Sequence, residues 1–595
     1  MTKNTKSLFI TVPHGDLPNI TPPFGALAVI NSLRRAGYKD TFLYNIDILR
    51  PSRENAIDYI VNYNPGLLCI SAPVSTSYEY CKFISLELKQ RLPNVTIILG
   101  GNLAVSAEIL LRRIGVDFCV LGEGEKVCCQ LFDKIAENRP RKEFYAIKGL
   151  AFLDGARIVN TGYADELSKE EIFDIDWGIL DSASAKCHFQ LVKDMDRRHK
   201  KYFFNNANGS LDLNSIDDAK QLLNKSIAML FSSKGCVTHC TFCHRYSKGI
   251  RIIPPDIVIA RIKELIERFN VGAIIFGDEC FGASHKWLKE LCELIKPLNI
   301  IWRVGGMRVS QVNPDIVKMM KEAGCRAIVY GTEAGSERIL KVMEKKVSLV
   351  DNYNAIRWTI EEGLYTVPQL VIGMPGECPE TINETADFLS YALTLDGSQN
   401  PKDVSINFAL ALPGTPLYEY GRSVGLIGAT IEEEERYLLS VSNTEAGDGT
   451  KMINFTHYPR LMLLSYPRFI KSIVNYRYMK KFNVDHYSKM IFREHRRLGI
   501  LHILENKSIS DIFYLYPTLV YKFRHLLWIV KFLEIIKANG LAYATGLFRE
   551  YLRFVRYKLR GKKVFFEYRS LRKTIDQNSN AYTGNKEMVM LRKGR

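Results

Sequence analysis

The sequence predicts an α/β protein with two successive series of strand and helix units and a mostly α-helical C-terminal region. In both series, apolar runs of strand length alternate with amphipathic stretches of helix length. At 595 residues the chain is too long for one hydrophobic core, and at ~150 residues each it should form about three or four domains. We expect the units to be residues 1–145, 146–225, 226–430 and 431–595.

The first unit, residues 1–145, predicts a Rossmann-like, doubly wound parallel sheet. Its strands are expected at residues 7–13, 41–46, 67–71, 95–99 and 118–121. A helix-length segment follows each of these strands, and parallel neighbours need such a crossover connection. Ligands of this kind of sheet bind at the carboxyl ends of the strands.

Small and glycine-rich turns stand at three of those carboxyl ends. They contain Ser71, Gly100, Gly101, Gly122, Glu123 and Gly124. Because glycine has no Cβ atom, a bulky ligand can approach its backbone closely. A further turn, Thr21-Pro-Pro-Phe-Gly25, leads into the first helix. Together these turns predict a ligand-binding edge.

Residues 146–225 predict a linker. Residues 148–159 have the pattern of a small hairpin. Residues 194–215 are rich in charged residues, asparagine and glycine, a composition typical of a loop or a partly ordered insertion.

Three cysteines, Cys236, Cys240 and Cys243, stand within eight residues directly after an apolar run, with C-x3-C-x2-C spacing and no fourth cysteine nearby in the sequence. Three thiolates in one loop suit a [4Fe–4S] cluster that keeps one iron open. Zinc is the alternative, since His239 or His244 could complete a tetrahedral site. The other cysteines fall mostly in apolar runs or helix-like segments, where buried packing is the expected role.

The cysteine loop, which follows a strand and carries Phe242 just before its last cysteine, resembles the cluster loop of the radical S-adenosylmethionine (SAM) enzymes. The second series fits this resemblance, with strands expected near residues 228–233, 272–277, 300–304, 326–331, 367–373 and 404–411. The resemblance implies a partial (β/α)6 barrel with its active residues at the carboxyl ends of the strands. It also implies that the open iron binds SAM.

Further turns resemble this family's motifs, namely Phe276-Gly-Asp-Glu279, Tyr330-Gly-Thr-Glu333-Ala-Gly-Ser336 and the late-strand segments 371–377 and 412–418. The resemblance implies SAM contacts by Phe242, Gly277, Asp278, Glu279, Arg308, Glu333 and Ser336. Tyr330 is a further pocket candidate, although a tyrosine near a barrel end is often structural. Val237 and Ala334 depart from the residues that relatives often carry there, proline and serine.

The first unit is similar to the cobalamin-binding domain found at the N-terminus of many radical SAM proteins. This resemblance implies that Ser71, Gly100, Gly101, Gly122, Glu123 and Gly124 border a cobalamin site. The D-x-H-x-x-G motif, which supplies a cobalt ligand in several cobalamin proteins, is missing, and His14 is the only histidine in the corresponding loop. A Rossmann-like domain that binds another nucleotide, or nothing, is the alternative.

The family resemblance implies a cobalamin-dependent radical SAM enzyme, a C-methyltransferase. Such an enzyme cleaves SAM to a 5′-deoxyadenosyl radical, abstracts hydrogen from an unactivated carbon and transfers a methyl group from methylcobalamin. An electron donor such as flavodoxin or ferredoxin and a small-molecule substrate would be its partners. A non-methylating, B12-dependent radical SAM cyclase or ring-modifying enzyme is one alternative. A zinc-stabilised, corrinoid-binding or membrane-surface adaptor without turnover is another.

The formal net charge of +17 comes entirely from the C-terminal part of the chain. Residues 451–595 contain 30 lysines and arginines against 9 acidic residues, whereas residues 1–450 contain 51 against 55. The basic residues alternate with 25 aromatic residues. A helical cap on the barrel, peripheral membrane contact with a lipid-like substrate, and nucleic-acid binding all stay open, although no RNA-binding motif favours the last.

The N-terminal residues contain no long apolar segment followed by a small-residue cleavage site, and the clustered cysteines need to be reduced thiolates. We therefore expect a cytoplasmic protein, possessing at most peripheral membrane contact through residues 431–595.

Overall fold

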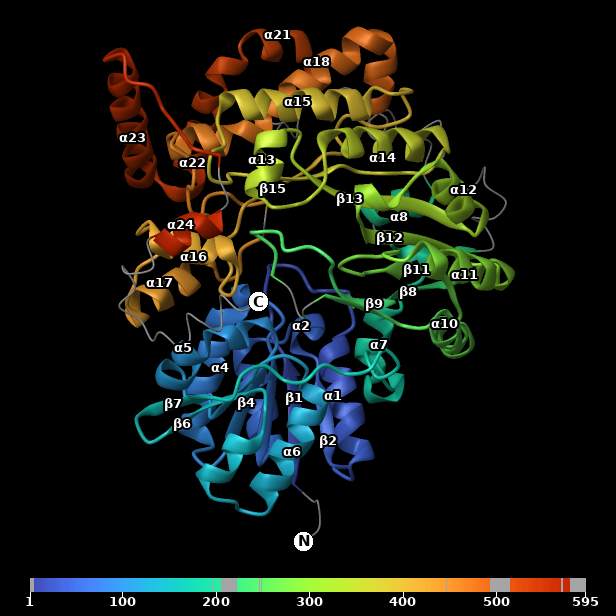
Figure 1. The fold of residues 1–595 in the computed structure, drawn as a ribbon, viewed down its shortest axis with the longest axis vertical. Coiled ribbons are helices and arrows are strands. Elements are labelled where there is room, and N and C mark those ends of the chain that lie inside the picture. Colours follow the sequence, from blue (N-terminus) through green and yellow to red (C-terminus); the bar gives the residue numbers. More distant parts are fainter. Residues whose placement is uncertain are drawn as a thin grey trace.

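A computed structural model of the chain describes residues 5–195, 197–204, 222–244, 247, 249–445, 447–492, 514–568 and 571–577. The N-terminal sheet lies at one end of the molecule, the second sheet lies beyond it, and the long helix of residues 460–492 lies at the opposite end (Figure 1). The predicted fold class is confirmed.

The N-terminal sheet has seven strands in the order β2-β1-β3-β4-β5-β6-β7. The first five are parallel, while β6 and β7 add an antiparallel edge. The elements are β1 (Ser7–Thr11), α1 (Phe24–Arg35), β2 (Thr41–Tyr44), α2 (Ile46–Leu49), α3 (Arg53–Tyr63), β3 (Leu67–Ser71), α4 (Tyr78–Arg91), β4 (Thr96–Gly100), α5 (Ala107–Arg113), β5 (Phe118–Val120), α6 (Gly124–Ala136), β6 (Leu150–Asp154) and β7 (Arg157–Asn160).

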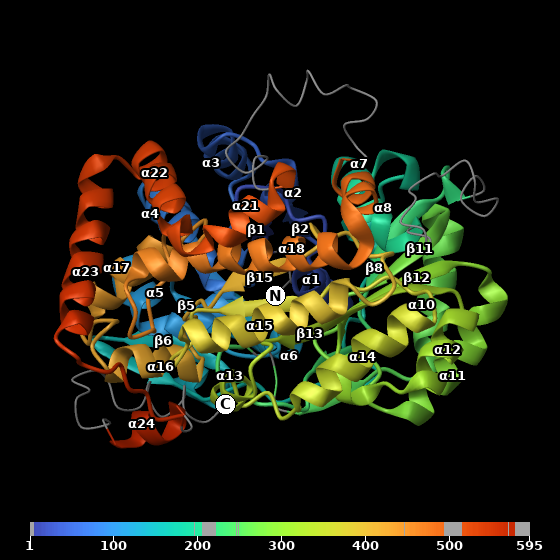
Figure 2. The same ribbon diagram turned by 90° about the horizontal axis from the view of Figure 1, so that it is seen from above.

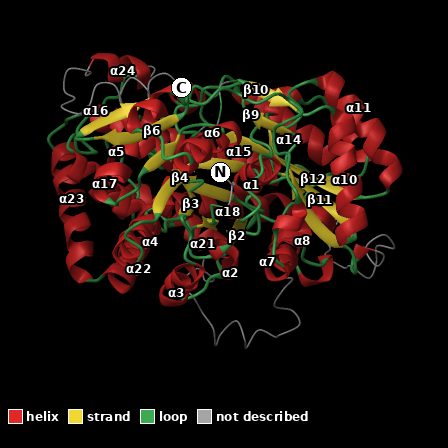
Figure 3. Cartoon of the chain, turned by 90° about the horizontal axis from the view of Figure 1, so that it is seen from below, coloured by secondary structure: helices red, strands yellow, loops and turns green. Residues whose placement is uncertain are grey.

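Helices cover both faces of this sheet, as its strands require, because most strand residues are buried. One apolar cluster joins α1 and α6 to one face, and a second cluster joins α3, α4 and α5 to the other. Figure 3 shows the strands between these two helix layers. The hairpin expected at residues 148–159 is β6 and β7, and it is hydrogen-bonded into the sheet.

The linker contains α7 (Ser182–His188) and α8 (Arg197–Phe204). Residues 197–204 belong to the stretch expected to be a loop or partly ordered insertion, so the helix there corrects that expectation. The physical reason is the apolar end of α8, because Phe203 and Phe204 are buried against the second sheet. Residues 205–215 of the expected insertion lie outside the described residues.

The second sheet has six parallel strands in the order β15-β14-β13-β12-β11-β8 and forms the predicted partial barrel. Its elements are β8 (Ser226–Leu230), α10 (Pro255–Phe269), β11 (Val271–Phe276), α11 (His285–Ile295), β12 (Ile301–Met307), α12 (Pro314–Glu322), β13 (Cys325–Glu333), α13 (Glu337–Val342), α14 (Leu349–Glu361), β14 (Gln369–Ile372), α15 (Pro379–Leu393) and β15 (Ser405–Phe408). A two-stranded ribbon, β9 (Ser233–Gly235) and β10 (Ile250–Ile252), flanks it.

The described C-terminal region is helical, as predicted. It contains α16 (Pro416–Ser423), α17 (Ile431–Val441), α18 (Arg460–Phe492), α21 (Pro517–Lys522), α22 (Leu527–Asn539), α23 (Leu541–Leu559) and α24 (Leu571–Gln577). Helix α18 packs along α15, and α21, α22 and α23 pack on α18 (Figure 2). Among the described helices, none combines the length and the apolar composition needed to cross a membrane.

A buried carboxylate on α17 ties the C-terminal region to the N-terminal sheet. Glu435 accepts a hydrogen bond from the Tyr78 hydroxyl at 2.9 Å and forms ion pairs with Lys82 at 2.6 Å and Arg113 at 2.8 Å. Burial alone would raise the pKa of Glu435, but the bonds from these three side chains hold it below its usual value. The carboxylate is therefore ionised in the folded protein.

We expect Glu435→Gln to lower the thermal midpoint by several degrees at pH 7, because it removes the anion that Lys82 and Arg113 share. Since the folded-state pKa is lowered, this stabilisation is present above the unfolded value of about 4.3 and is lost as pH falls through the folded value. Differential scanning calorimetry at several pH values measures it.

Glu432→Gln is the matched control on the same helix, because the Glu432 side chain is 56% exposed and that of Glu435 only 5%. Equal losses for the two variants, or a Glu435→Gln deficit that does not shrink at all as the solution is acidified below the unfolded-state pKa, would contradict the bridge.

Candidate functional site

The cysteine loop follows β8 and is held from two sides. The Thr241 amide donates to the Met343 carbonyl at 2.9 Å, at the end of α13, and the Leu417 amide of α16 donates to the Thr241 carbonyl at 2.8 Å. The ribbon of β9 and β10 fixes the start of the loop through the pairing of Gly235 with Ile250. The loop is therefore a fixed part of the barrel end.

The three loop thiols differ in exposure. Cys240 is buried, Cys236 is half-buried and Cys243 is exposed. The Thr238 hydroxyl lies 3.2 Å from the sulfur of Cys236 and 3.6 Å from that of Cys240. Among the described residues, no group of three or more His, Cys, Asp or Glu side chains is arranged to hold a single ion.

The two histidines considered as zinc ligands have other neighbours. The His244 ring lies beside Gly414, where an added Cβ atom would stand 3.1 Å from its Nε2. The carbonyl of His239 accepts a hydrogen bond from Arg572 of α24 at 3.2 Å.

A fourth cysteine, Cys280, lies beside the loop although it is distant in sequence. Hydrogen bonding from the Cys280 thiol is the main cause that lowers the pKa of Cys236 to about 5, and the Thr238 contact adds to it. The same bond, together with burial, raises the pKa of Cys280. Cys236 is thus a thiolate at neutral pH, the form that binds iron. Sequence reasoning assigned Cys280 to packing, and its place directly after Glu279 was the available signal.

The Gly-Asp-Glu turn after β11 contains residues of two kinds. Gly277 and Glu279 line the cavity described below. Asp278 instead accepts hydrogen bonds from the Ser232 amide at 2.9 Å and the Ser233 hydroxyl at 2.6 Å. Burial raises the pKa of Asp278 to about 6, against the lowering effect of these bonds. Asp278 therefore positions the chain that enters the cysteine loop.

Glu333, at the end of β13, pairs with a lysine that sequence reasoning did not select. Lys345 lies 2.8 Å from the Glu333 carboxylate, and both side chains are nearly buried. That carboxylate folds back over Gly331, where an added Cβ atom would stand 2.4 Å from Glu333 Oε1. Only glycine leaves room for this arrangement.

The remaining SAM candidates lie around this pair. Arg308 donates to the carbonyls of Lys345 at 3.3 Å and Lys346 at 3.1 Å. Phe242 packs in the apolar cluster that contains Met343. The Ser336 hydroxyl hydrogen-bonds Glu384 of α15, so the side chain is used within the fold and its SAM contact stays a prediction. The Tyr330 hydroxyl lies 2.8 Å from the hydroxyl of Thr359, on the side of β13 covered by α14.

One cavity of about 450 Å³ lies between the N-terminal sheet and the barrel. All six residues predicted to border cobalamin line it, together with Gly277 and Glu279 from the barrel. Thr21, Pro22, Pro23, Phe24 and Gly25 line it as well. Gly101 has φ +93°, and an added Cβ atom there would stand 2.3 Å from the Ala72 carbonyl oxygen, so glycine is required at this turn.

Glu123 lines this cavity and also joins the sheet to the barrel. Its carboxylate pairs with Lys234 at 2.9 Å and with Arg251, which donates to Oε2 at 3.0 Å. It also accepts from the Leu167 amide at 2.6 Å. Burial alone would raise the pKa of Glu123, but the bonds from Arg251, Lys234 and Leu167 lower it.

His14, the open cobalt-ligand candidate, is not among the residues that line the cavity. Its Nδ1 lies 3.6 Å from Asp47, whose carboxylate also pairs with Arg50 at 2.8 Å. A second histidine also contacts a lining residue: His188 of α7 lies 2.9 Å from the side chain of Asn45. Burial lowers the pKa of His188, so that ring is neutral near pH 7.

Family models match both parts of the chain. The model described as "B12 binding domain" matches residues 11–132, and the model described as "Radical SAM superfamily" matches residues 230–389. The chain is a radical SAM protein with a B12-binding domain. The two matched regions are the N-terminal sheet and the barrel that face each other across the cavity.

Curated relatives of this B12-binding radical SAM protein include cyclases and methylases. The anaerobic magnesium-protoporphyrin IX monomethyl ester cyclase of Cereibacter sphaeroides is 26% identical over 67% of this chain and 60% of its own length. The hopanoid C-3 methylase of Methylococcus capsulatus is 24% identical over 59% of this chain and 60% of its own. The chain thus spans less than two thirds of the length of these relatives.

Solved structures share the fold. The cobalamin-dependent S-adenosylmethionine radical enzyme OxsB superimposes with a TM-score of 0.58 at 14% identity, covering 98% of this chain and 84% of that one. The radical S-adenosylmethionine methyltransferase TsrM from Kitasatospora setae gives 0.52 at 17% identity, covering 71% and 76%.

The three-cysteine prediction is tested by alanine variants after anaerobic reconstitution. We expect Cys236→Ala, Cys240→Ala and Cys243→Ala each to lose most of the bound iron and sulfide and the visible absorbance of the cluster. Cys280→Ala should keep them, because a [4Fe–4S] cluster with an open iron takes three protein thiolates. Iron and sulfide assays with visible spectra measure this.

Cys292→Ala serves as a control for removal of a buried thiol remote from the loop, since Cys292 packs on α11. If Cys280→Ala stayed folded and lost its iron as fully as Cys240→Ala, Cys280 would be a fourth ligand and the open iron would be ruled out.

Proposed function

We propose that this chain is a cobalamin-dependent radical SAM enzyme that transfers a methyl group to an unactivated carbon of a small molecule. The observation that carries the proposal is the shared cavity: the six predicted cobalamin residues line the same space as Gly277 and Glu279 of the barrel. A B12-binding domain and a radical SAM barrel thus open onto a common volume, as a reaction that needs both cofactors requires.

The residues present fit these groups. Ser71, Gly100 and Gly101 leave an edge without bulky side chains, where the tail of a cobalamin would lie. Cys236, Cys240 and Cys243 would hold the cluster. Glu279 and Glu333 supply carboxylates suited to the ammonium group of SAM.

When bound and reduced, these cofactors supply a 5′-deoxyadenosyl radical and a methyl group. The protein's own share is orientation and exclusion. Lys345 balances the charge of Glu333 and fixes its carboxylate over Gly331. Arg308 holds the turn that carries Lys345. An edge-to-face contact between Phe24 and Phe231, with ring centroids 4.8 Å apart, helps to close the space between the two domains to water.

A non-methylating cyclase is the second candidate function, because the cyclase of Cereibacter sphaeroides and that of Rubrivivax gelatinosus are among the relatives. The methylating reading is supported by the names of other relatives, two hopanoid methylases. The two candidates differ in the fate of SAM, since only methyl transfer converts SAM to S-adenosylhomocysteine.

The deciding experiment is anaerobic incubation of the reconstituted protein with cobalamin, SAM, a reductant such as reduced flavodoxin, and a small-molecule extract of cells that lack the protein. We expect 5′-deoxyadenosine and S-adenosylhomocysteine in matched amounts and a product one methylene heavier, measured by mass spectrometry. The Cys240→Ala variant is the control, and it should form neither nucleoside.

5′-Deoxyadenosine without S-adenosylhomocysteine would contradict methyl transfer and favour the cyclase. A colourless, zinc-loaded protein that forms neither nucleoside would contradict the enzyme itself and favour the corrinoid-binding adaptor.

We also propose that the outer C-terminal helices contact the surface of an anionic membrane. Exposed apolar side chains recur every three or four residues between the start of α21 and the middle of α22, namely Tyr516, Leu519, Phe523, Leu526, Ile529 and Leu533. Leu519 is 55% exposed and Leu533 is 53% exposed. Large exposed apolar side chains concentrated in one segment are typical of an interaction surface.

Helix α23 adds a basic stripe beside an apolar one. Arg549, Arg553, Arg556 and Arg560 recur at intervals of four and three residues, so they share one side of the helix. Leu541, Leu552 and Leu559 share an adjacent side, and Leu559 is 81% exposed. This combination suits a helix that lies on anionic lipid. The inner helix α18 covers α15, and α21, α22 and α23 pack on α18, which fits the helical cap expected as an alternative.

Flotation of the full-length protein with vesicles tests this contact. We expect binding to phosphatidylcholine vesicles that contain phosphatidylglycerol, and little binding to phosphatidylcholine alone. Arg553→Gln with Arg556→Gln should weaken binding by about 1 kcal/mol per residue, roughly fivefold each. Leu519→Ser with Phe523→Ser should weaken it several-fold.

Leu294→Ser with Val350→Ser is the matched control, since these exposed apolar residues lie on α11 and α14. Absence of flotation with the anionic vesicles, or equal loss in the control, would contradict the membrane contact. Binding to RNA instead would favour the nucleic-acid alternative.

A further inference from the structure

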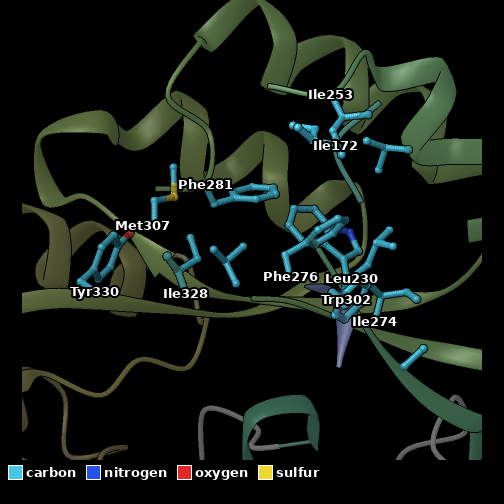
Figure 4. Packing of buried hydrophobic residues seen from close by; sticks show 14 of the residues in the cluster. Ile172, Leu230, Ile253, Ile274, Phe276, Phe281, Trp302, Met307, Ile328 and Tyr330 are labelled. Carbon is cyan, nitrogen blue, oxygen red and sulfur yellow. The ribbon is translucent and has the colours of Figure 1, made fainter. Parts of the chain in front are cut away.

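The strand β12 presents its two faces to different surroundings. Trp302 and Val304 are fully buried on the face covered by helices. Figure 4 shows Trp302 on that face with Phe276, Ile274 and Ile328 from the neighbouring strands. Successive side chains of a strand point to opposite faces. Arg303, between Trp302 and Val304, therefore lies on the concave face, inside the partial barrel.

Aromatic rings of α8 form the immediate surroundings of Arg303. Its guanidinium lies 4.6 Å from the centroid of the Tyr202 ring and 5.9 Å from that of Phe203. Nε of Arg303 is buried and has no hydrogen-bond partner in the described part of the chain. Helix α8 lies close to β12 and β13 (Figure 1). Its rings therefore give the concave face a floor on that side.

No carboxylate of the described residues pairs with Arg303. The carboxylate of Asp403 contacts α8 but has other partners. Asp403 pairs with Lys201 of α8 at 2.6 Å and accepts from the Tyr365 hydroxyl at 2.7 Å. A cation withdrawn from water without a counter-charge is costly, so such a group ordinarily has a partner. Burial lowers the pKa of Arg303, but arginine begins from about 12.5 or higher and stays a cation.

The concave face beyond Arg303 leads toward a residue that lines the cavity. Arg303 is the register partner of Ile275 on β11. Gly277, two residues after Ile275 and just beyond the end of β11, lines the cavity. Two residues of strand span roughly 6.6 Å. Gly305 occupies the equivalent position on β12 and adds no side chain. Arg303, Gly305 and Gly331 all keep partial exposure.

Polar residues complete this face on the far strands. Gln369 of β14 and Ser405 of β15 are register partners, and Asn407 follows two residues after Ser405. All three are partly exposed. Leu370 and Ile372, also on β14, are buried. Among the described residues, the concave face thus offers the Arg303 cation and several neutral hydrogen-bonding groups.

We propose that Arg303 binds an anionic group of the substrate, a carboxylate or a phosphate, inside the barrel. This inference rests on the proposed function, because it places the substrate between the α8 floor and the cofactor cavity. Arginine offers two parallel N–H donors to either group, and a partly desolvated site strengthens the bond. Anchoring at Arg303 would set which carbon of the substrate reaches the reactive end of the cavity.

Isothermal titration of the anaerobically reconstituted protein, with SAM present, tests the anion site. Inorganic phosphate and succinate are the probes, and they separate the two anionic groups. We expect wild-type protein to bind at least one of them, Arg303→Gln to bind it at least tenfold more weakly, and Arg303→Lys to lie between. Arg326→Gln, which alters an exposed arginine of β13, should bind like wild type.

A footprint on the wild-type protein makes the test independent of how the variants fold. Phenylglyoxal modifies arginine side chains, and mass spectrometry locates them. The bound probe should protect Arg303 and leave Arg326 reactive. If wild type bound neither probe, or if Arg303→Gln bound equally and no protection appeared at Arg303, the anion site would be overturned.

The proposed function is tested separately by measuring the release of 5′-deoxyadenosine from SAM in the absence of substrate. Wild type and Arg326→Gln should both show this release, because Arg326 is an exposed residue of β13. Loss of release in wild type would count against the enzyme, whatever the anions do.

Discussion

The fold of the site depends on one buried carboxylate, that of Glu123. Glu123 stands shortly after β5, at the carboxyl ends of the parallel strands. Its charge is neutralised by Lys234 and Arg251 from the ribbon beside the cysteine loop. Removing one partner of a buried ion pair typically costs about 3–5 kcal/mol, because the remaining charge stays in low dielectric. The two cations therefore help to hold the glycine turns of one domain against the ribbon beside the barrel, next to the cavity that Glu123 and Lys234 both line.

Two turns of the site require glycine. Gly101 must adopt a left-handed conformation in close approach to Ala72, and Gly331 leaves the room that the Glu333 carboxylate occupies. A methyl group at either place would collide with backbone or with the ion pair to Lys345. The same requirement explains why the turns were informative as sequence: a residue chosen for the absence of a side chain signals that something must come close.

Most of the fold could be predicted from local patterns. The strands of both sheets were expected within a few residues of their observed bounds, because hydrophobic periodicity is a local property. The six glycine-turn residues meet at one edge because parallel strands end on the same side. Cys280 and Lys345 were missed for the opposite reason: each acts through a residue of another segment, Cys236 and Glu333, to which local periodicity does not connect it. Helix α8 was missed because charged neighbours obscured its three aromatic residues.

The arrangement inside the barrel and the arrangement outside it place different demands on a substrate. Arg303 lies deep, on an aromatic floor, and calls for an anionic group. The helices α21, α22 and α23 present apolar and basic side chains to the surroundings. A molecule with one anionic end and an apolar remainder satisfies both, since its charge would be neutralised at Arg303 while its apolar part would come from a membrane surface. A fully neutral apolar substrate would leave the Arg303 guanidinium without a counter-charge. Covering this charge with such a substrate would be unfavourable.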